Sequence, residues 1–164
     1  MHEPPPLPAL DENKLIRRLA TLVTRLHLDR GDFVIFGSGP LLAHGLRPSI
    51  HDLDIVARGP AWRHVSRYGC PGTGSVNGAS MALFWSGLIQ FSQGWISADW
   101  DADDLIDGAE IIQGWPFARL ADVLAYKQAL LRPKDHPDIA ALRQALHQPA
   151  PRAAQAAEAA IVVW

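Results

Sequence analysis

The amino-acid sequence predicts an α/β (α+β) fold in which helices flank a mixed β-sheet. Short runs of β-branched and aromatic residues, typical of buried strands, alternate with segments whose apolar residues recur at helical spacing. The predicted order is helix, strand, short helix, strand, helix, hairpin, strand and two helices. This order is expected of a mixed sheet covered by helices, and not of an all-helical or all-β protein.

In the first half of the chain, helices alternate with apolar strands. Leucines and isoleucines at helical spacing predict an amphipathic helix, with Asp11 placed to cap its N-terminus. The apolar runs FVIF and LDIVA predict two buried strands, and Pro60 suits the first turn of the helix after them. The predicted elements are a helix at 11–28, strands at 33–36 and 53–57, a short helix at 41–44, and a helix from 60 to 68.

The second half is predicted to complete the sheet and to end in two helices. MALFW and LIQFS flank Ser86 and Gly87 and therefore predict a hairpin. A glycine-rich stretch and an acidic stretch, in contrast, are predicted to be loops. The predicted segments are a loop at 69–80, a hairpin at 81–92, an acidic loop at 97–104, a last strand at 109–113, and helices at 116–131 and 134–147.

The composition predicts a globular protein and disfavours DNA as a general partner. The 164 residues are 48% hydrophobic and 20% charged, with a net charge of -2 and no basic block, which disfavours generic DNA binding. Cys70 is the single cysteine, and no segment is apolar for long enough to span a membrane, so we expect a cytoplasmic protein. The expected parts are a proline-rich arm at 1–10, one folded domain at 11–148 and an alanine-rich tail at 149–164.

Two aspartates near the second predicted strand are the main chemical feature. Asp52 and Asp54 are two positions apart, so along a strand they point the same way, with Cα atoms about 6.6 Å apart. Two carboxylates beside an apolar sheet repel each other and lose solvation, and a bound Mg²⁺ relieves both costs. The preceding turn at Gly37 and Ser38 lets the backbone approach a phosphate closely. The alternative is an exposed strand end whose charges serve only solubility.

A glycine-serine turn after a strand, then thirteen residues and an Asp-apolar-Asp-apolar pattern, resembles the signature of the nucleotidyltransferase superfamily with the polymerase-beta-like fold. The later segment YKQALLRPKDHPDIAAL resembles a helical motif of the minimal nucleotidyltransferases related to the AbiEii toxins. The residues that match the two motifs are Gly37, Ser38, Asp52, Asp54, Lys127, Arg132, Lys134, Asp135 and Asp138.

The resemblance implies a nucleotidyltransferase-like fold and transfer of a nucleotidyl group from a nucleoside triphosphate to a hydroxyl of a small molecule, a protein or an RNA. It also implies two Mg²⁺ ions on Asp52 and Asp54, release of pyrophosphate, and a toxin-like protein with a cognate antitoxin-like partner. Gly37, Ser38, Lys127, Arg132 and Lys134 are then candidates for binding the nucleotide. For Lys127 the alternative is a solvated lysine on a helix. Asp135 and Asp138 are expected to be structural, with Asp135 bracing the site together with Arg132 and Lys134.

One residue departs from the family pattern and leaves two functions open. The family usually carries a third carboxylate on a later strand, and the corresponding strand here has Gln90. An amide is neutral and accepts no proton at ordinary pH, so it cannot act as a base or offset metal charge. The alternatives are an active nucleotidyltransferase and a catalytically impaired protein that binds a nucleotide or a partner. An aspartate of the acidic loop, at 99, 101, 103 or 104, is a further candidate for the missing acid.

Overall fold

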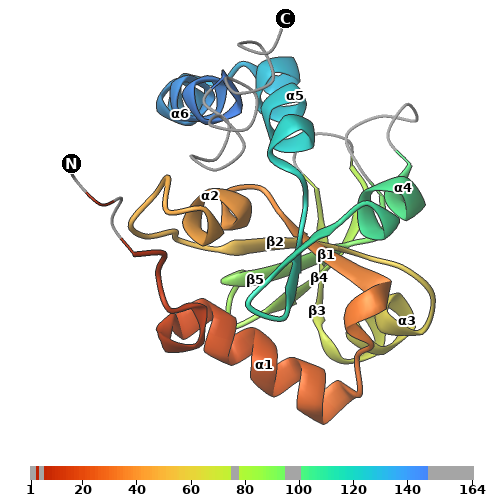
Figure 1. The fold of residues 1–164 in the computed structure, drawn as a ribbon. Coiled ribbons are helices and arrows are strands. Elements are labelled where there is room, and N and C mark those ends of the chain that lie inside the picture. The colour runs from red at the N-terminus through yellow and green to blue at the C-terminus, as the bar shows by residue number, and fades with distance from the viewer. Residues whose placement is uncertain (1–2, 4–5, 75–77, 95–100, 148–164) are drawn as a thin grey trace, which may run out of the picture. The chain divides into compact units, whose positions relative to one another are not determined.

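The computed structural model describes residues 3, 6–74, 78–94 and 101–147. It divides into two compact units, Met1–Arg119 and Leu120–Trp164. The predicted tail at 149–164 and part of the proline-rich arm lie outside the described residues. The first unit holds a mixed sheet with helices on it, and the second holds a pair of helices (Figure 1). The predicted fold class, a mixed sheet flanked by helices, is therefore confirmed.

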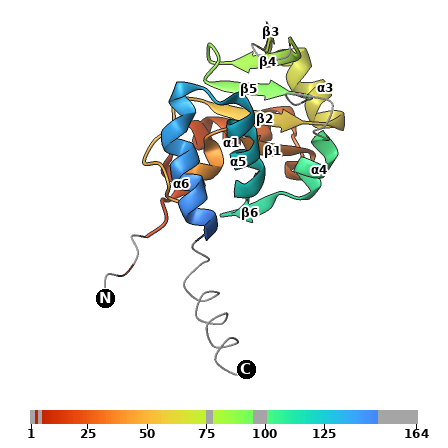
Figure 2. The ribbon, with the colours of Figure 1, turned by 90° about the horizontal axis from the view of Figure 1, so that it is seen from above.

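The sheet has seven strands in the order β3-β4-β5-β2-β1-β7-β6. The pairs β2–β5 and β1–β7 are parallel, and the other neighbours are antiparallel. Figure 2 shows the succession from β3 at one edge to β1. The strands are β1 (Phe33–Phe36), β2 (Leu53–Ala57), β3 (Cys70–Thr73), β4 (Ser80–Phe84), β5 (Ile89–Ser92), β6 (Glu110–Ile112) and β7 (Trp115–Phe117).

Helices precede, connect and follow these strands. The α-helices of the first unit are α1 (Lys14–Leu26), α2 (Gly39–Ala43), α3 (Gly59–Tyr68) and α4 (Ala102–Asp107), with 3-10 turns η1 (Leu10–Glu12) and η2 (Arg30–Asp32). The second unit contains α5 (Leu120–Leu130), the 3-10 turn η3 (Pro133–Asp135) and α6 (His136–His147).

Because side chains alternate in direction along each strand, one face of the sheet is apolar and the other carries polar groups. On the apolar face, buried side chains of α1 and α3 form one cluster with Phe33, Ile35, Leu53, Ile55, Ala57, Ile89 and Phe91. The intervening residues point to the opposite face. They include the buried Val34, Phe36 and Val56, and also Asp54 and Gln90. Asp54 and Gln90 thus lie on the face away from the main core.

Four local predictions are wrong, each because a tertiary contact or a better cap decides the structure. Asn13, not Asp11, caps α1, since its side chain accepts hydrogen bonds from the backbone N–H groups of Leu15 and Ile16. Part of the predicted loop at 69–80 is the edge strand β3, which pairs with β4. The predicted helix at 116–131 loses its start to β7, which pairs with β1. Part of the predicted acidic loop is α4.

Candidate functional site

The predicted turn after β1 is built around Gly37 and lies directly against Asp54. Gly37 has a φ of 62°, in the left-handed region that favours glycine. A Cβ atom at this position would lie 2.6 Å from the Asp54 Oδ2 atom, closer than any real contact. The sequence predicts that this turn lets the backbone approach a phosphate, and in the structure the group that lies against Gly37 is the Asp54 carboxylate.

Asp54 and Gln90 are neighbours in adjacent strands. The antiparallel register pairs Phe36 of β1 with Asp54 of β2, and the parallel register pairs Asp54 with Gln90 of β5. Paired residues in neighbouring strands lie about 5 Å apart and share a face. The Gln90 Nε2 atom donates a hydrogen bond to the backbone oxygen of Gly87, at 2.9 Å. The glutamine therefore stands beside the carboxylate, with its amide nitrogen directed to the hairpin turn.

Asp52 lies one residue before β2, and not within the strand. The strand begins at Leu53, whose N–H donates to the backbone oxygen of Leu88 at 2.9 Å. Asp52 and Asp54 are both partly exposed. Among the described residues there is no group of three or more histidine, cysteine, aspartate or glutamate side chains able to hold a metal. A Mg²⁺ ion held by these two carboxylates would take its remaining oxygen ligands from water or from a substrate.

Sequence reasoning missed Arg47, which contacts the turn. Its Nη1 atom donates a hydrogen bond to the Ser38 Oγ atom, at 3.1 Å. Ser38 directly precedes α2, but its hydroxyl caps no backbone N–H group of that helix. The sequence signals only a reversal of the chain, because Gly45 ends the short helix two residues before the arginine, and it does not signal the contact with Ser38.

In the second unit, Lys127, Arg132, Asp135 and Asp138 form a cluster of two cations and two carboxylates. Lys127 Nζ lies 3.1 Å from Asp138 Oδ2 and 3.4 Å from Asp135 Oδ1. The Arg132 side chain donates to both oxygens of Asp135, at 2.7 and 3.1 Å. Lys127 is only 3% exposed, so it is not a solvated lysine, whereas Lys134 is exposed. The structure therefore joins four of the motif residues and does not bring Lys134 into the cluster.

The electrostatics of this cluster follow from its pairing. Burial by itself would raise the pKa of the Asp135 carboxyl. The hydrogen bond from Arg132 and the charge of Lys127 outweigh burial and hold this pKa below its ordinary value of 3.8. Asp135 is consequently ionised at neutral pH, and the two carboxylates balance the two cations.

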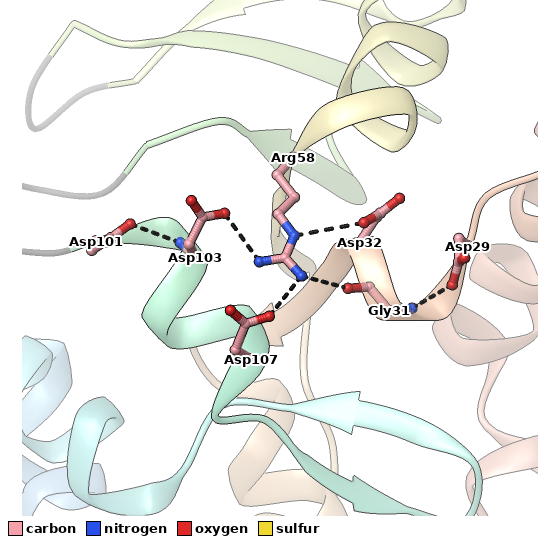
Figure 3. A network of polar contacts seen from close by, with 7 residues as sticks. All are labelled: Asp29, Gly31, Asp32, Arg58, Asp101, Asp103 and Asp107. Carbon is pink, nitrogen blue, oxygen red and sulfur yellow. Dashed lines mark hydrogen bonds and ion pairs between the residues drawn. The ribbon is translucent and has the colours of Figure 1, made fainter.

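The acidic stretch, a candidate source of the missing acid, forms ion pairs with Arg58 at the other end of β2. Arg58 follows β2 and donates to Asp103 at 3.0 Å, to Asp107 at 2.7 Å and to the backbone oxygen of Gly31 at 3.2 Å (Figure 3). The hydrogen bond from Arg58 lowers the pKa of Asp107, and the two carboxylates raise the pKa of Arg58. Arg58 is four positions after Asp54, which corresponds to about 13 Å along a strand.

The remaining acidic candidates are Asp101, Asp104 and Asp99, and the structure describes the first two. Asp101 caps α4, because its side chain accepts a hydrogen bond from the N–H of Asp103 at 2.9 Å. Asp99 lies outside the described residues. Asp104 is exposed in the first turn of α4. Within the part of the chain that is described, Gln90 is the polar side chain that the β2–β5 register places opposite Asp54.

Substituting Gly37 tests the close approach of the turn to Asp54. We expect Gly37→Ala to destabilise the protein by more than the about 1–3 kcal/mol that a left-handed non-glycine residue usually costs, because its Cβ would also displace the Asp54 carboxylate. Gly59→Ala is the matched control, since Gly59 has a φ of 55° and nothing within 4 Å of an added Cβ. Urea unfolding measures both variants. Equal destabilisation of the two variants would refute a steric contribution from Asp54.

Comparison of this chain with protein-family models, with curated proteins and with solved structures found no match in any of the three. The likeness to nucleotidyltransferases therefore rests on the motif residues themselves. Among the described residues, no helix is both long enough and apolar enough to cross a membrane.

Proposed function

We propose that this protein is a Mg²⁺-dependent nucleotidyltransferase that moves a nucleotidyl group from a nucleoside triphosphate to a hydroxyl acceptor. The observation that carries the proposal is the contact of the Asp54 carboxylate with the Gly37 turn. This contact puts an oxygen ligand for a cation beside a backbone bend that has no side chain of its own. A metal-bound triphosphate needs both features, because its phosphates require close approach and its cation requires carboxylates.

The residues present suit Mg²⁺ better than a softer metal. Asp52 and Asp54 would hold the ion through oxygen, and Mg²⁺ commonly binds through one or two carboxylates plus substrate phosphates. When bound, the ion supplies charge neutralisation for the phosphate chain. The resemblance implies two ions, whereas these two carboxylates carry enough charge to balance only one. We therefore expect one tightly held ion, with any second ion arriving with the nucleotide.

The proposed reaction is a substitution at the α-phosphorus. The acceptor oxygen forms a bond to this phosphorus, the bond to the bridging oxygen breaks, and pyrophosphate leaves with that electron pair. The proton of the acceptor hydroxyl passes to Asp54 or to water, because the Gln90 amide accepts no proton. We assign Lys127 and Arg132 a structural role in the second unit, since both are paired with buried carboxylates there. Lys134 remains an exposed cation suited to an anionic substrate.

Gln90 favours a second candidate function, in which the same site binds a nucleotide or a partner protein without transferring anything. The β2–β5 register pairs this glutamine with Asp54, the position where the family resemblance expects an acid. Its hydrogen bond to Gly87 gives the amide a structural role that a carboxylate would not fill. A toxin-like protein of the cytoplasm, neutralised by an antitoxin-like partner, is compatible with either candidate.

Restoring the acid distinguishes the two functions. For an active enzyme, we expect the wild-type protein to release pyrophosphate from a nucleoside triphosphate and Mg²⁺ when a cell extract supplies acceptors. Gln90→Glu is then expected to increase the rate by about 100-fold, the lower end of the usual range for general-base catalysis. Gln144→Glu, an exposed amide on α6, is the matched control and is expected to leave the rate unchanged.

Each other outcome has a definite reading. Nucleotide binding without pyrophosphate release, in both the wild-type protein and Gln90→Glu, supports the binding function. A large loss of turnover in Gln90→Glu would show that the amide itself takes part in the reaction. Absence of any metal-dependent nucleotide binding by the wild-type protein contradicts both the transferase and the nucleotide-binding function, and leaves only binding of a partner protein.

A further inference from the structure

Arg47 places a positive charge at the turn that faces the Asp54 carboxylate. Its guanidinium donates to Ser38 Oγ at 3.1 Å, and Ser38 follows Gly37, the residue in contact with Asp54. Arg47 is neither fully buried nor fully exposed, so a dissolved ligand can reach it. A guanidinium and a carboxylate thus contact successive residues of one turn.

The backbone fixes where Arg47 lies. Gly45 has a φ of 71°, which reverses the chain after α2. The N–H groups of Leu46 and Arg47 then both donate to the backbone oxygen of Leu41, at 2.8 and 3.3 Å. Because two hydrogen bonds anchor the residues that carry it, the guanidinium is held beside Ser38 with little further loss of entropy on binding.

The chemistry of this pair suits a phosphate. A serine hydroxyl has two lone pairs and one hydrogen, so Ser38 can accept from Arg47 and still donate to a phosphate oxygen. Within the described residues its hydroxyl donates to no acceptor. A guanidinium is permanently charged and presents planar N–H groups that match the oxygens of a phosphate. The pair therefore offers a charged donor and a neutral donor at adjacent points.

The negative charge of the two aspartates is a second reason to expect that Arg47 contacts a phosphate. Without a cation from the protein, the negative charge of Asp52 and Asp54 would repel a triphosphate wherever the metal does not screen it. An arginine at the turn offsets this repulsion. A site of this composition selects a ligand that carries both a divalent cation and several phosphate oxygens, in preference to a bare metal or a neutral molecule.

We propose that Arg47, held against Ser38, is a further residue that binds the phosphate chain of a metal-complexed polyphosphate, which is the triphosphate of the nucleotide if the function proposed above holds. The inference depends on that function only for the identity of the ligand. In the reaction, Arg47 is a positioning residue that holds the leaving phosphates while the Asp52 and Asp54 carboxylates hold the metal.

Calorimetric titration with inorganic tripolyphosphate and with ATP, each with Mg²⁺, tests the proposal. We expect Arg47→Gln to weaken the binding of both probes by about 10- to 100-fold, the range expected for loss of a charge-assisted hydrogen bond. Adenosine, which has no phosphate, is expected to bind Arg47→Gln and the wild-type protein equally. Arg63→Gln makes the same charge change at an exposed position of α3 and is expected to bind both probes like the wild-type protein.

Two further variants cover the case in which Arg47→Gln fails to fold. Arg47→Lys keeps the charge but loses the planar donor set, and Ser38→Ala keeps the arginine but loses the hydroxyl. Each is expected to weaken tripolyphosphate binding, with a smaller effect than Arg47→Gln. Unchanged binding in the folded variants would overturn the proposal, and a lower unfolding temperature with unchanged binding would show that the pair is structural only.

The two probes separate this inference from the proposed function. If tripolyphosphate binds through Arg47 but ATP does not bind, the phosphate site stands and the nucleotide function fails. If ATP binds with Mg²⁺ and the Arg47 variants bind it equally well, the nucleotide function stands and the role of Arg47 fails.

Discussion

Replacing Asp54 with asparagine is expected to abolish the Mg²⁺-dependent part of nucleotide binding, with a loss of affinity of at least about 100-fold. Removing a residue that merely orients a ligand of a metal already costs about 10- to 100-fold, and Asp54 is proposed as a ligand itself. Asparagine has nearly the same shape but no charge, so the substitution preserves the packing against Gly37. The measurement is calorimetric titration of ATP with and without Mg²⁺.

The matched control for this substitution is Asp104→Asn. Asp104 is exposed on α4 in the same unit and undergoes the same loss of charge. We expect its nucleotide affinity to equal that of the wild-type protein. If Asp54→Asn binds the nucleotide as the wild-type protein does, or if the two variants lose affinity equally, a specific ligand role for Asp54 is excluded.

The second large effect is expected on stability, from Lys127→Met. This change leaves Asp135 and Asp138 buried without the lysine that neutralises them, and breaking a buried ion pair costs about 3–5 kcal/mol. Urea unfolding followed by circular dichroism measures the loss. Lys134→Met makes the same chemical change at an exposed position of η3 and is expected to alter the free energy of unfolding by less than about 0.5 kcal/mol. Similar values for the two variants would contradict a structural role for Lys127.

The pH dependence of unfolding tests the same cluster independently. The pKa of Asp135 is lowered below 3.8 in the folded protein, so the stabilisation is fully present above pH 3.8 and is lost as the pH falls through the lowered pKa. Lys127→Met removes one cause of the lowered pKa. The stability of this variant is therefore expected to fall less steeply with acid over that interval than the stability of the wild-type protein.

Local patterns in the sequence predicted the central strands well. β1 and β2 begin and end where FVIF and LDIVA predict, because short apolar runs of this kind are stable only inside a sheet. β3 and β7 escaped prediction because their residues, CPGT and WPF, contain proline and resemble a turn and a helix start. Only pairing makes them strands: β3 pairs with β4, the next strand along the chain, and β7 pairs with β1, which is distant in the sequence.

In the candidate site, too, some features follow from the local sequence and others depend on contacts between distant segments. The spacing of Gly37, Asp52 and Asp54 predicts a carboxylate near a glycine turn, and the antiparallel pairing of β1 with β2 produces that contact. The family resemblance predicted only that Gln90 lies on the later strand that usually carries the third acid, and the parallel pairing of β5 with β2 is what places it opposite Asp54. Arg47 could not be predicted, since its approach to Ser38 depends on the reversal of the chain at Gly45.

The burial of Lys127 likewise could not be read from helical spacing. A lysine on an amphipathic helix is usually solvated, and only the turn at η3 brings Asp135 and Asp138 back against it. Sequence alone therefore identified the motif residues but not whether they face solvent or one another.

Paramagnetic broadening by Mn²⁺, added in place of Mg²⁺ together with ATP, tests most directly whether a cation and a polyphosphate bind at the Gly37 turn. Amide signals of an isotope-labelled sample report how close each residue lies to the ion. We predict the strongest broadening at Gly37, Ser38 and Asp54, with little effect at Asp103 and Asp107, the acidic residues at the other end of β2. Broadening centred on Asp103 and Asp107, or none at Gly37 and Asp54, would contradict the account.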